Sequence, residues 1–458
     1  MRLKSPVPAL CLIVLALSLI SCSASRRSSR FFQKKLKPEI ENSPVFQRGF
    51  TGFHLMDAQT GQELCAVNAS RYFTPASNTK ILTLATSLAV LGDSIPRFRY
   101  VFGGPDSSEP NGIYIITGTG DPTTLHPFFQ AWQQPPDFYR EHPGAFRFFM
   151  LPQGSSSLER FGPGWMWDDF PSGYSPEISV LPVYGNMLTL CWDGTAWMVY
   201  PDTFRQQVLP LETAITVQRR ALEPTIEVPQ DPNFPANNCF EVPMHNPGLV
   251  AHKLLNDSVR VASPPYPPYV DVPEINLQEL PNSWYATPVD TVYRRLMYQS
   301  DNFIAEQLLV LCSGVKFDSI GQAQLIAWAK DSLFAGLPDP PRWVDGSGLS
   351  RYNLISPRFL TSLLRKLYLE QPPERLFSLF ATGGVSGTIQ NWYAGPEGKP
   401  VVFAKTGTMS GVHCLSGYLR TRRGRILVFS FMHNNFLGNN NAWKLEMQRL
   451  LKSIWQDD

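Results

Sequence analysis

Charged residues are scarce in this chain of 458 residues, and the two signs nearly cancel. Lysine, arginine, aspartate and glutamate make up 17% of the sequence, against roughly 25% in typical soluble domains. The net charge of +2 excludes the strongly basic surface of a nucleic-acid-binding protein, so we expect no nucleic-acid partner. The seven histidines are scattered, without cysteine or carboxylate at ligand spacing, so the sequence predicts no metal site and no cofactor.

Proline, by contrast, is abundant, and there are enough apolar residues for a substantial core. The 41 prolines exceed the usual ~5% of a sequence, which predicts long, stiffened loops. Hydrophobic residues make up 43% of the chain, and its length accommodates about three domains. We therefore expect a globular protein of several domains.

The first candidate site is a Ser-x-x-Lys motif that runs from Ser77 to Lys80. Apolar residues follow it at helical spacing as far as Leu91, and Gly92 ends the pattern, so we expect Ser77 to begin a buried helix. Free N–H groups at a helix start can stabilise an oxyanion. Lys80, one turn on, can take the proton of a Ser77 nucleophile. Taken alone, the motif is better explained by an N-cap serine and a solvated first-turn lysine, and only the two further motifs favour the catalytic interpretation.

The second candidate site is the Ser-x-Asn motif at Ser300-Asp-Asn302. Short apolar helical faces at 292–296 and 303–309 flank it, which predicts a turn between two helices. There Ser300 can relay a proton between Lys80 and a leaving amine, and the Asn302 amide can hold Lys80 and a substrate carbonyl. A plain helix cap is the alternative for this motif alone.

The third motif, Lys405-Thr406-Gly407-Thr408, lies in an apolar, β-branched run that predicts a strand. Unpaired N–H groups of a strand edge can bind an extended peptide. Lys405, Thr406 and Thr408 offer charge and hydroxyls for a substrate carboxylate. An ordinary edge strand with a protective lysine is the alternative. We interpret the nearby His413 as a strand residue and not as a base.

In this order the three motifs form the set found in penicillin-binding proteins and serine β-lactamases. The chain resembles the low-molecular-mass class C penicillin-binding proteins, which are D-alanyl-D-alanine carboxypeptidases and endopeptidases of bacterial peptidoglycan. The resemblance extends from about residue 52 to residue 434. Its further short matches are Phe73–Lys80, Gly118–Pro122, Gly164–Asp169, Asp345–Arg351 and Gly387–Thr388.

Spacing separates this family from its relatives. Residues 81–299 lie between the first two motifs, where a class A β-lactamase has only a short helical stretch, so we expect an inserted domain. No glutamate between Ser300 and Lys405 has an asparagine four residues later, so the deacylating glutamate of class A enzymes is missing. We therefore expect β-lactams to be covalent inhibitors and not rapidly hydrolysed substrates.

The resemblance implies an α+β fold of the penicillin-binding and β-lactamase-like transpeptidase type. This fold has an antiparallel five-stranded sheet flanked by helices, here with a large β-rich insertion. Residues 50–56 and 62–67 form a predicted hairpin of that sheet. We expect a catalytic domain in two parts, 46–100 and 285–458, around an inserted region at 101–284.

The activity implied by the resemblance is that of a serine-type D-Ala-D-Ala carboxypeptidase/endopeptidase. Such an enzyme cleaves the terminal D-Ala-D-Ala bond or D-Ala cross-links of peptidoglycan stem peptides through an acyl-enzyme. The resemblance assigns catalysis to Ser77, Lys80, Ser300 and Asn302. Two alternatives stay open: a catalytically slow lipoprotein that binds peptidoglycan, and a β-lactam hydrolase.

Substrate binding is predicted for the third motif and for parts of two other matched segments. In the resembled family, insertion residues border the catalytic cleft, so we add Asp168 and Asp169 to the binding residues. Arg351, from the matched segment Asp345–Arg351, is added as well. A carboxylate between aromatic walls can select a free amine on the third stem residue. The alternative is that the neighbouring tryptophans are core and the aspartates cap a turn.

The chain begins with two basic residues and an apolar run at 9–20 that is too short for a membrane span. With the following Ser-Cys22, this segment resembles a bacterial lipoprotein signal, which implies removal of residues 1–21 and a lipid on Cys22. A plain secretory peptide is the alternative. The polar, basic stretch 22–45 predicts a flexible tether near a membrane. We expect a lipid-anchored protein on the periplasmic side of a bacterial membrane.

Cysteine pairing is open. Besides Cys22 and a cysteine in the predicted signal, the chain has Cys65, Cys191, Cys239, Cys312 and Cys414, an odd number in an oxidising compartment. A Cys191–Cys239 bridge within the inserted region is one of several pairings that the sequence allows.

Overall fold

The computed structural model describes residues 30–103, 113–132, 135–142, 145–148, 158–221, 223–231, 233–248, 250–251, 254 and 280–457. The chain divides into two compact units, which are described separately. The first comprises the residues up to Asn78, Gly336–Pro341 and the residues from Leu354 onwards. The second comprises Thr79–Ala335 and Arg342–Asn353.

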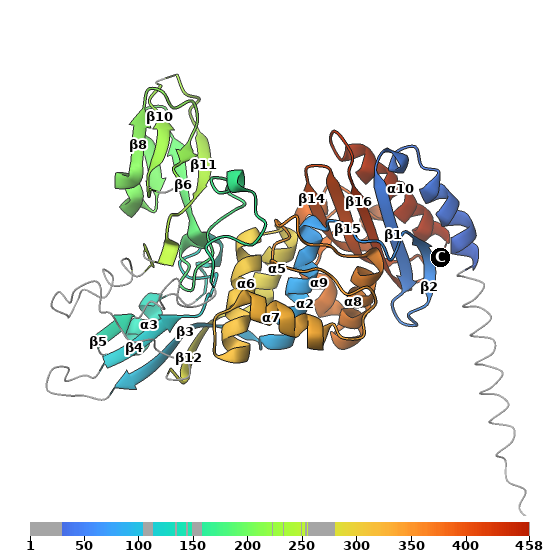
Figure 1. The fold of residues 1–458 in the computed structure, drawn as a ribbon, viewed down its shortest axis with the longest axis horizontal. Coiled ribbons are helices and arrows are strands. Elements are labelled where there is room, and N and C mark those ends of the chain that lie inside the picture. The colour runs from blue at the N-terminus through green and yellow to red at the C-terminus, as the bar shows by residue number, and fades with distance from the viewer. Residues whose placement is uncertain are drawn as a thin grey trace, which may run out of the picture. The chain divides into compact units, whose positions relative to one another are not determined.

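The first unit contains a six-stranded antiparallel sheet with the order β13-β14-β15-β16-β1-β2 (Figure 1). The prediction of an antiparallel sheet within an α+β fold is confirmed. Five strands form the predicted sheet, and the very short β13 adds a sixth at the edge. The strands are β1 (Phe50–Asp57), β2 (Glu63–Val67), β13 (Ala381–Thr382), β14 (Val402–Met409), β15 (Val412–Arg420) and β16 (Ile426–Asn434).

Helices α8 (Pro357–Glu370) and α10 (Asn441–Asp457) cover opposite faces of this sheet. On the α8 side, His54 of β1 forms a hydrogen bond with Thr361 of α8. On the α10 side, Trp443 packs against the ring of His433 in β16. His54 pairs with Ser430 in the ladder, and side chains alternate between faces along a strand, so Ser430 and His433 point to opposite sides. Helix α9 (Pro373–Leu379) follows α8.

The predicted tether is wrong over residues 30–41, which are helical. Phe32, Leu36 and Ile40 recur every four residues and are buried. Glu39 of the same helix forms an ion pair of 2.8 Å with Arg449 of α10. The basic residues of this stretch suggested a solvated segment, but the apolar stripe between them is the stronger signal. The predicted signal and Cys22 lie outside the described residues. In the described ranges, no helix is long and apolar enough to cross a membrane.

The second unit has a helical part, in which α6 packs against the other helices. Helix α6 is almost wholly buried from Phe303 to Gly314, and its polar residues Glu306 and Gln307 are buried together with the apolar ones. This helix therefore forms the centre around which the candidate site residues of this unit are held. The helices are α2 (Lys80–Val90), α5 (Val289–Tyr298), α6 (Asn302–Phe317) and α7 (Gln322–Trp328).

The rest of the second unit is rich in β-structure and contains three small sheets, with the orders β12-β3-β4-β5, β11-β6-β7 and β8-β10-β9. The predicted domain boundaries near residues 100 and 285 fall inside β3 and β12, which pair with each other. Helix α3 (Pro135–Glu141) follows β4 in the chain. The strands are β3 (Ser94–Gly103), β4 (Ile113–Gly118), β5 (Ala145–Phe148), β6 (Met187–Trp192), β7 (Trp197–Tyr200), β8 (Val208–Leu211), β9 (Gln218–Arg219), β10 (Ile226–Pro229), β11 (Asn238–Pro243) and β12 (Asn282–Pro288).

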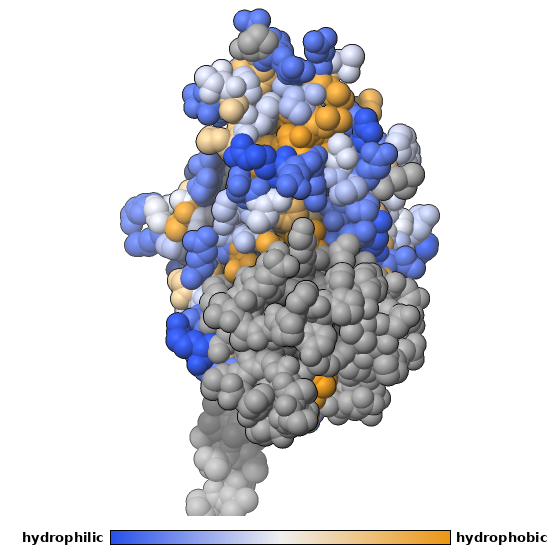
Figure 2. Space-filling model, turned by 90° about the vertical axis from the view of Figure 1, so that its left-hand side faces the viewer, coloured by the Kyte–Doolittle hydropathy of each residue, from blue (hydrophilic) through white to orange (hydrophobic). Residues whose placement is uncertain are grey.

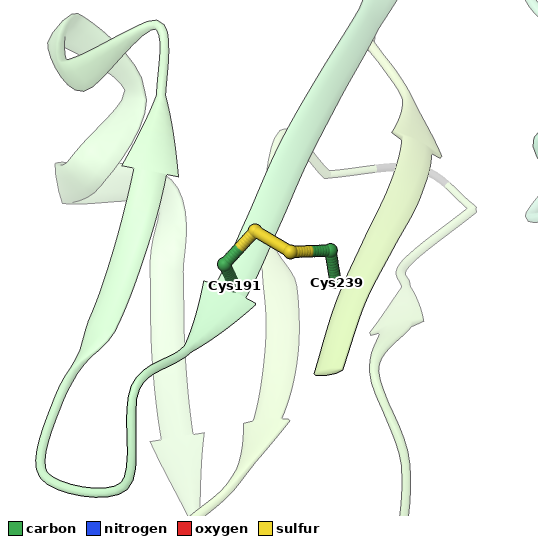
Figure 3. The surroundings of a disulfide bond; sticks show 2 residues. All are labelled: Cys191 and Cys239. Carbon is green, nitrogen blue, oxygen red and sulfur yellow. A yellow bond between two sulfur atoms is a disulfide. The ribbon is translucent and has the colours of Figure 1, made fainter. Parts of the chain in front are cut away.

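A disulfide joins Cys191 of β6 to Cys239 of β11, which lie opposite each other in the ladder (Figure 3). One of the pairings that the sequence left open is therefore present. The three remaining cysteines of the described ranges, Cys65, Cys312 and Cys414, are free and buried. Figure 2 shows a mostly hydrophilic described surface on one side of the molecule, with smaller hydrophobic areas.

Candidate active site

Ser77 lies in a short 3-10 turn, η2 (Ala76–Thr79), that leads directly into α2. The preceding Ala76 has a left-handed backbone with φ of +46°, a conformation that costs an L-residue energy and is common at functional sites. The next residue, Asn78, is buried and donates from Nδ2 to Ser416 Oγ of β15 at 2.7 Å. Ser77 is thus not the N-cap of an ordinary helix. A strained turn, tied to the sheet, holds it.

The Lys-Thr-Gly motif lies on β14, and Gly407 brings this strand against the Ser77 turn. A Cβ at Gly407 would lie 2.4 Å from Pro75 O, closer than real Cβ atoms approach another atom, and 3.1 Å from Ser77 N. Strand alternation puts Lys405 on the same face as Gly407. Lys405 is fully buried, and its Nζ donates to Thr406 O at 2.7 Å. Within this unit, the nucleophile turn and the motif strand are therefore in contact.

The two threonines of the motif have hydroxyl partners. Thr406 Oγ1 lies 2.8 Å from Thr388 Oγ1, and Thr408 Oγ1 lies 2.8 Å from His413 Nδ1. His413 is buried on β15, and burial lowers the pKa of its imidazole to about 3, helped by the charge of Lys444. It is thus a neutral strand residue, as the sequence predicted, and it orients Thr408.

In the second unit, Lys80 is the first residue of α2 and is completely buried. Its Nζ donates to Asn302 Oδ1 at 2.6 Å and to Ser347 O at 2.7 Å. Burial lowers the pKa of this ammonium to about 8, although the nearby carboxylates of Asp345 and Glu306 oppose the shift. The alternative of a solvated lysine is therefore wrong. A lysine with this pKa is neutral in part of the molecules near neutral pH, as a general base requires.

The Ser-x-Asn motif occupies the predicted turn between two helices, α5 and α6. Ser300 has a left-handed backbone with φ of +58°. Asp301 caps α6 by accepting from Ile304 N at 3.1 Å, and it also accepts from Arg295 Nε at 2.9 Å. Asp301, the middle residue of the motif, is therefore the N-cap of α6. This leaves the Asn302 amide for two other partners, Lys80 and the carbonyl oxygen of Tyr174.

The sequence left two interpretations for the matched segment Gly164–Asp169, an exposed binding patch or a capped turn with core tryptophans, and the structure agrees with a part of each. Asp169 caps a turn, because it accepts from Met166 N at 3.3 Å and from the Tyr174 hydroxyl at 2.7 Å. Asp168 is exposed. Trp167 is 85% exposed and so does not belong to the core. This loop therefore presents an aromatic ring and a carboxylate to solvent.

Two buried carboxylates, Asp345 and Glu306, are essential to this geometry and were not predicted. Asp345 accepts from Gly348 N, Ser350 N and Asn353 Nδ2 at 2.6 to 2.9 Å. It also accepts from the Trp165 indole at 3.0 Å. The run of small residues after an aspartate was the available signal, because such a run predicts a loop folded around the carboxylate. Arg351, predicted to bind substrate, is exposed in this loop.

An antiparallel sheet that carries the Lys-Thr-Gly motif, together with a Ser-x-x-Lys helix, defines a penicillin-binding fold. The crystal structure of penicillin-binding protein 4 from Haemophilus influenzae superposes with a TM-score of 0.68 at 18% sequence identity, covering 90% of this chain and 96% of that chain. The chain belongs to the D-Ala-D-Ala carboxypeptidase 3 (S13) family, whose model matches residues 32–196 and 282–452.

Individual relatives agree with this assignment. A carboxypeptidase of Mycobacterium tuberculosis is 26% identical over 88% of this chain and 79% of its own length. A D-alanyl-D-alanine carboxypeptidase of Actinomadura is 24% identical over 87% of this chain and 80% of its own length. The carboxypeptidase DacB of Haemophilus influenzae is 30% identical over a shorter match that covers 32% of each chain.

Proposed function

We propose that this protein is a serine DD-peptidase that cleaves peptidoglycan stem peptides through an acyl-enzyme on Ser77. Membership of the D-Ala-D-Ala carboxypeptidase family supports the substrate class. The observation that carries the serine mechanism is the buried Lys80, whose lowered pKa and hydrogen bond to Asn302 suit a general base.

In the proposed reaction, Ser77 Oγ attacks the carbonyl carbon of the D-alanyl amide while Lys80 takes the hydroxyl proton. Backbone N–H groups of the Ser77 turn and of β14 stabilise the oxyanion. Ser300 passes the proton to the leaving amine as the C–N bond breaks. Water then hydrolyses the ester and restores Ser77. A terminal D-alanine is released from a pentapeptide, whereas a cross-linked substrate yields two separated stems.

Substrate binding is proposed for residues whose chemistry suits individual groups of the stem peptide. We propose that Lys405 and the threonines of its motif hold the terminal carboxylate. The exposed Asp168 and Trp167 suit a free amine on the third stem residue. We propose that the exposed Arg351 contacts a carboxyl group of the stem peptide. A lipid on Cys22 would keep the enzyme on the periplasmic side of a bacterial membrane, where this substrate is found.

The decisive experiment uses Ser77→Ala with a fluorescent penicillin and with defined muropeptides. We expect no labelling and no turnover, and nearly the same result for Lys80→Ala, because the two residues act as one unit. Ser378→Ala, a helix serine whose hydroxyl bonds its own backbone turn, is the matched control. Mass spectrometry of pentapeptide and cross-linked products separates carboxypeptidase from endopeptidase action. Labelling of Ser77→Ala at the wild-type rate would refute the assignment.

The β-lactam response distinguishes the remaining alternatives. We propose that penicillins acylate Ser77 and remain bound for minutes or longer, because the deacylating glutamate of class A enzymes is missing. The related Haemophilus influenzae protein has been solved in complex with a β-lactam. Rapid turnover of nitrocefin would instead favour a β-lactam hydrolase. Normal penicillin labelling without muropeptide cleavage would favour a binding lipoprotein.

A further inference from the structure

Glu306 is a buried carboxylate that the proposed reaction leaves without a role. It lies one turn after Asn302 on α6 and is 2% exposed. Its Oε1 accepts from Ser347 N at 2.7 Å, and its Oε2 accepts from Gly346 N at 3.0 Å. Gln322 of α7 donates to Oε2 at 3.2 Å. A carboxylate is costly to bury, so this complete set of donors indicates a site built to hold it.

The loop that Glu306 holds also touches α2 at two points. Ser347 O accepts from Lys80 Nζ at 2.7 Å. Gly346 O accepts from Thr83 Oγ1 at 2.7 Å. A Cβ at Gly346 would lie 2.5 Å from Ala305 O, so only glycine lets the loop approach α6 this closely. The Gly346–Ser347 backbone is therefore clamped between α6 and α2, and its carbonyl oxygen is aimed at Lys80.

We propose that Glu306 is a positioning residue for Lys80: from α6 it fixes the Gly346–Ser347 backbone, and through the Ser347 carbonyl it sets the place and charge of the Lys80 amine. This inference rests on the proposed function. Glu306 acts through the loop and does not itself touch the reacting atoms. Asn302, in the first turn of the same helix, binds the same amine directly. Two residues of α6 therefore position Lys80, Asn302 by direct contact and Glu306 through the loop.

The electrostatics of the cluster make this role measurable. The charged groups of the cluster besides Glu306 are Lys80 of α2, Asp345 of the loop, which acts on both Glu306 and Lys80, and Asp301 at the start of α6, which acts on Lys80. Helix α7 contributes the neutral Gln322. Burial and the charge of Asp345 raise the pKa of Glu306 to about 7. Glu306 in turn favours the charged form of Lys80. Protonation of Glu306 would turn an oxygen that accepts backbone N–H groups into a donor, and so would loosen the clamp.

Acylation should therefore need two deprotonations, of Glu306 and of Lys80. Because burial raises the pKa of Glu306 and lowers the pKa of Lys80, both groups should take up a proton within a narrow pH range, and the wild-type rate should fall with a two-proton dependence on the acid side. In Glu306→Gln the dependence should become one-proton, and its midpoint should move below pH 8 because a charge that favours ammonium is gone. The alkaline plateau should drop by roughly tenfold or more, since the Ser347 carbonyl loses its support.

The experiment measures the second-order rate of penicillin acylation from pH 5.5 to 9.5. Glu306→Asp keeps the charge but is one methylene too short to reach both N–H groups, so it should lose plateau rate and keep the two-proton dependence. Glu374→Gln, an exposed glutamate on α9, is the matched control and should leave the whole profile unchanged. A folded Glu306→Gln with the wild-type plateau and acid limb overturns the inference.

A milder variant keeps the test decisive if Glu306→Gln does not fold. Gln322→Met removes one hydrogen-bond donor to the Glu306 carboxylate, which should raise the pKa of Glu306. The two-proton fall of the acylation rate on the acid side should therefore move to higher pH, while the rate at alkaline pH should stay unchanged. An unchanged limb contradicts the inference. Failure of the proposed function is separately visible, because Ser77→Ala would then still acylate. If Ser77→Ala is inactive and both Glu306 and Gln322 variants match the wild type, only the role of Glu306 is refuted.

Discussion

Asn302 Nδ2 donates to the backbone carbonyl oxygen of Tyr174 at 2.8 Å. The Tyr174 hydroxyl in turn donates to Asp169, and the other end of the Asn302 amide accepts from Lys80. Tyr174 thus links the loop that carries Asp169 to the candidate base, through its hydroxyl at one end and its backbone carbonyl at the other. The Asn302 amide carries two N–H groups, of which the bond to Tyr174 uses one, and we propose that the second serves the substrate carbonyl.

The two aspartates of this loop should differ in their effects on catalysis. Asp169 is occupied by the turn and by Tyr174, whereas Asp168 is exposed. Asp168→Asn should therefore reduce kcat/KM only for peptides with a free amine on the third residue, by about 1–3 kcal/mol for a charge-assisted contact. Kinetics with paired amine-bearing and amine-free peptides measure this difference.

Asp169→Asn is the matched comparison for that experiment. It keeps an acceptor oxygen but weakens the turn, so both peptides should lose activity by a similar factor. If Asp168→Asn affects both peptides equally, or neither, the loop is structural and the amine is selected elsewhere.

Gly407→Ala should damage the nucleophile turn directly. Its Cβ would meet backbone atoms, Pro75 O at 2.4 Å and Asn78 N at 2.9 Å, which cannot rotate away as a side chain can. We expect a loss of stability of about 1–3 kcal/mol, as for other overpacked sites, and a large loss of penicillin labelling. Thermal unfolding and labelling kinetics measure the two effects. Gly92→Ala is the control, since a Cβ at Gly92 would have no described atom within 4 Å apart from those of its chain neighbours.

The sequence predicted those parts of the molecule that local patterns determine. The hairpin of β1 and β2, the strand of the third motif, and the turn at Ser300 all follow from short-range periodicity and turn residues. The strained backbone at Ala76 was beyond such reasoning, because the contact of its turn with Gly407 comes from a distant part of the chain.

Glu306 and Asp345 show the same limit. Glu306 looked like one polar residue on a helix, and only the fold brings the N–H groups of Gly346 and Ser347 to it. The helix at residues 30–41 is a different case. Its apolar stripe was present in the sequence, but the basic residues between Phe32 and Ile40 outweighed it in the interpretation.

The predicted lipid anchor is tested by metabolic labelling with a palmitate analogue. Wild-type protein should take up the label and Cys22→Ala should not, because the thiol that carries the diacylglycerol is gone. Cys65→Ala, which removes a buried free cysteine, is the control and should be labelled normally. Equal labelling of wild type and Cys22→Ala would contradict a lipoprotein signal.

Three buried histidines should make the fold sensitive to mild acid. Burial lowers the pKa of His126 to about 4 and that of His413 to about 3, and it lowers the pKa of His433 well below the usual value. In the unfolded chain each titrates near its ordinary value of about 6.5. Below that pH the unfolded state binds protons that the folded state cannot, so stability should fall as pH decreases from about 6.5 towards the folded pKa values.

Each of these histidines should contribute a slope of about 1 kcal/mol per pH unit in that window. Thermal unfolding at pH 7, 6 and 5 should therefore show a steadily falling Tm. His413→Asn replaces the imidazole with an amide that does not titrate and can still accept a hydrogen bond from Thr408, so its Tm should fall less steeply with pH than that of the wild type. A Tm that stays constant from pH 7 to 5, or an equal slope in His413→Asn, would show that these imidazoles become protonated without unfolding.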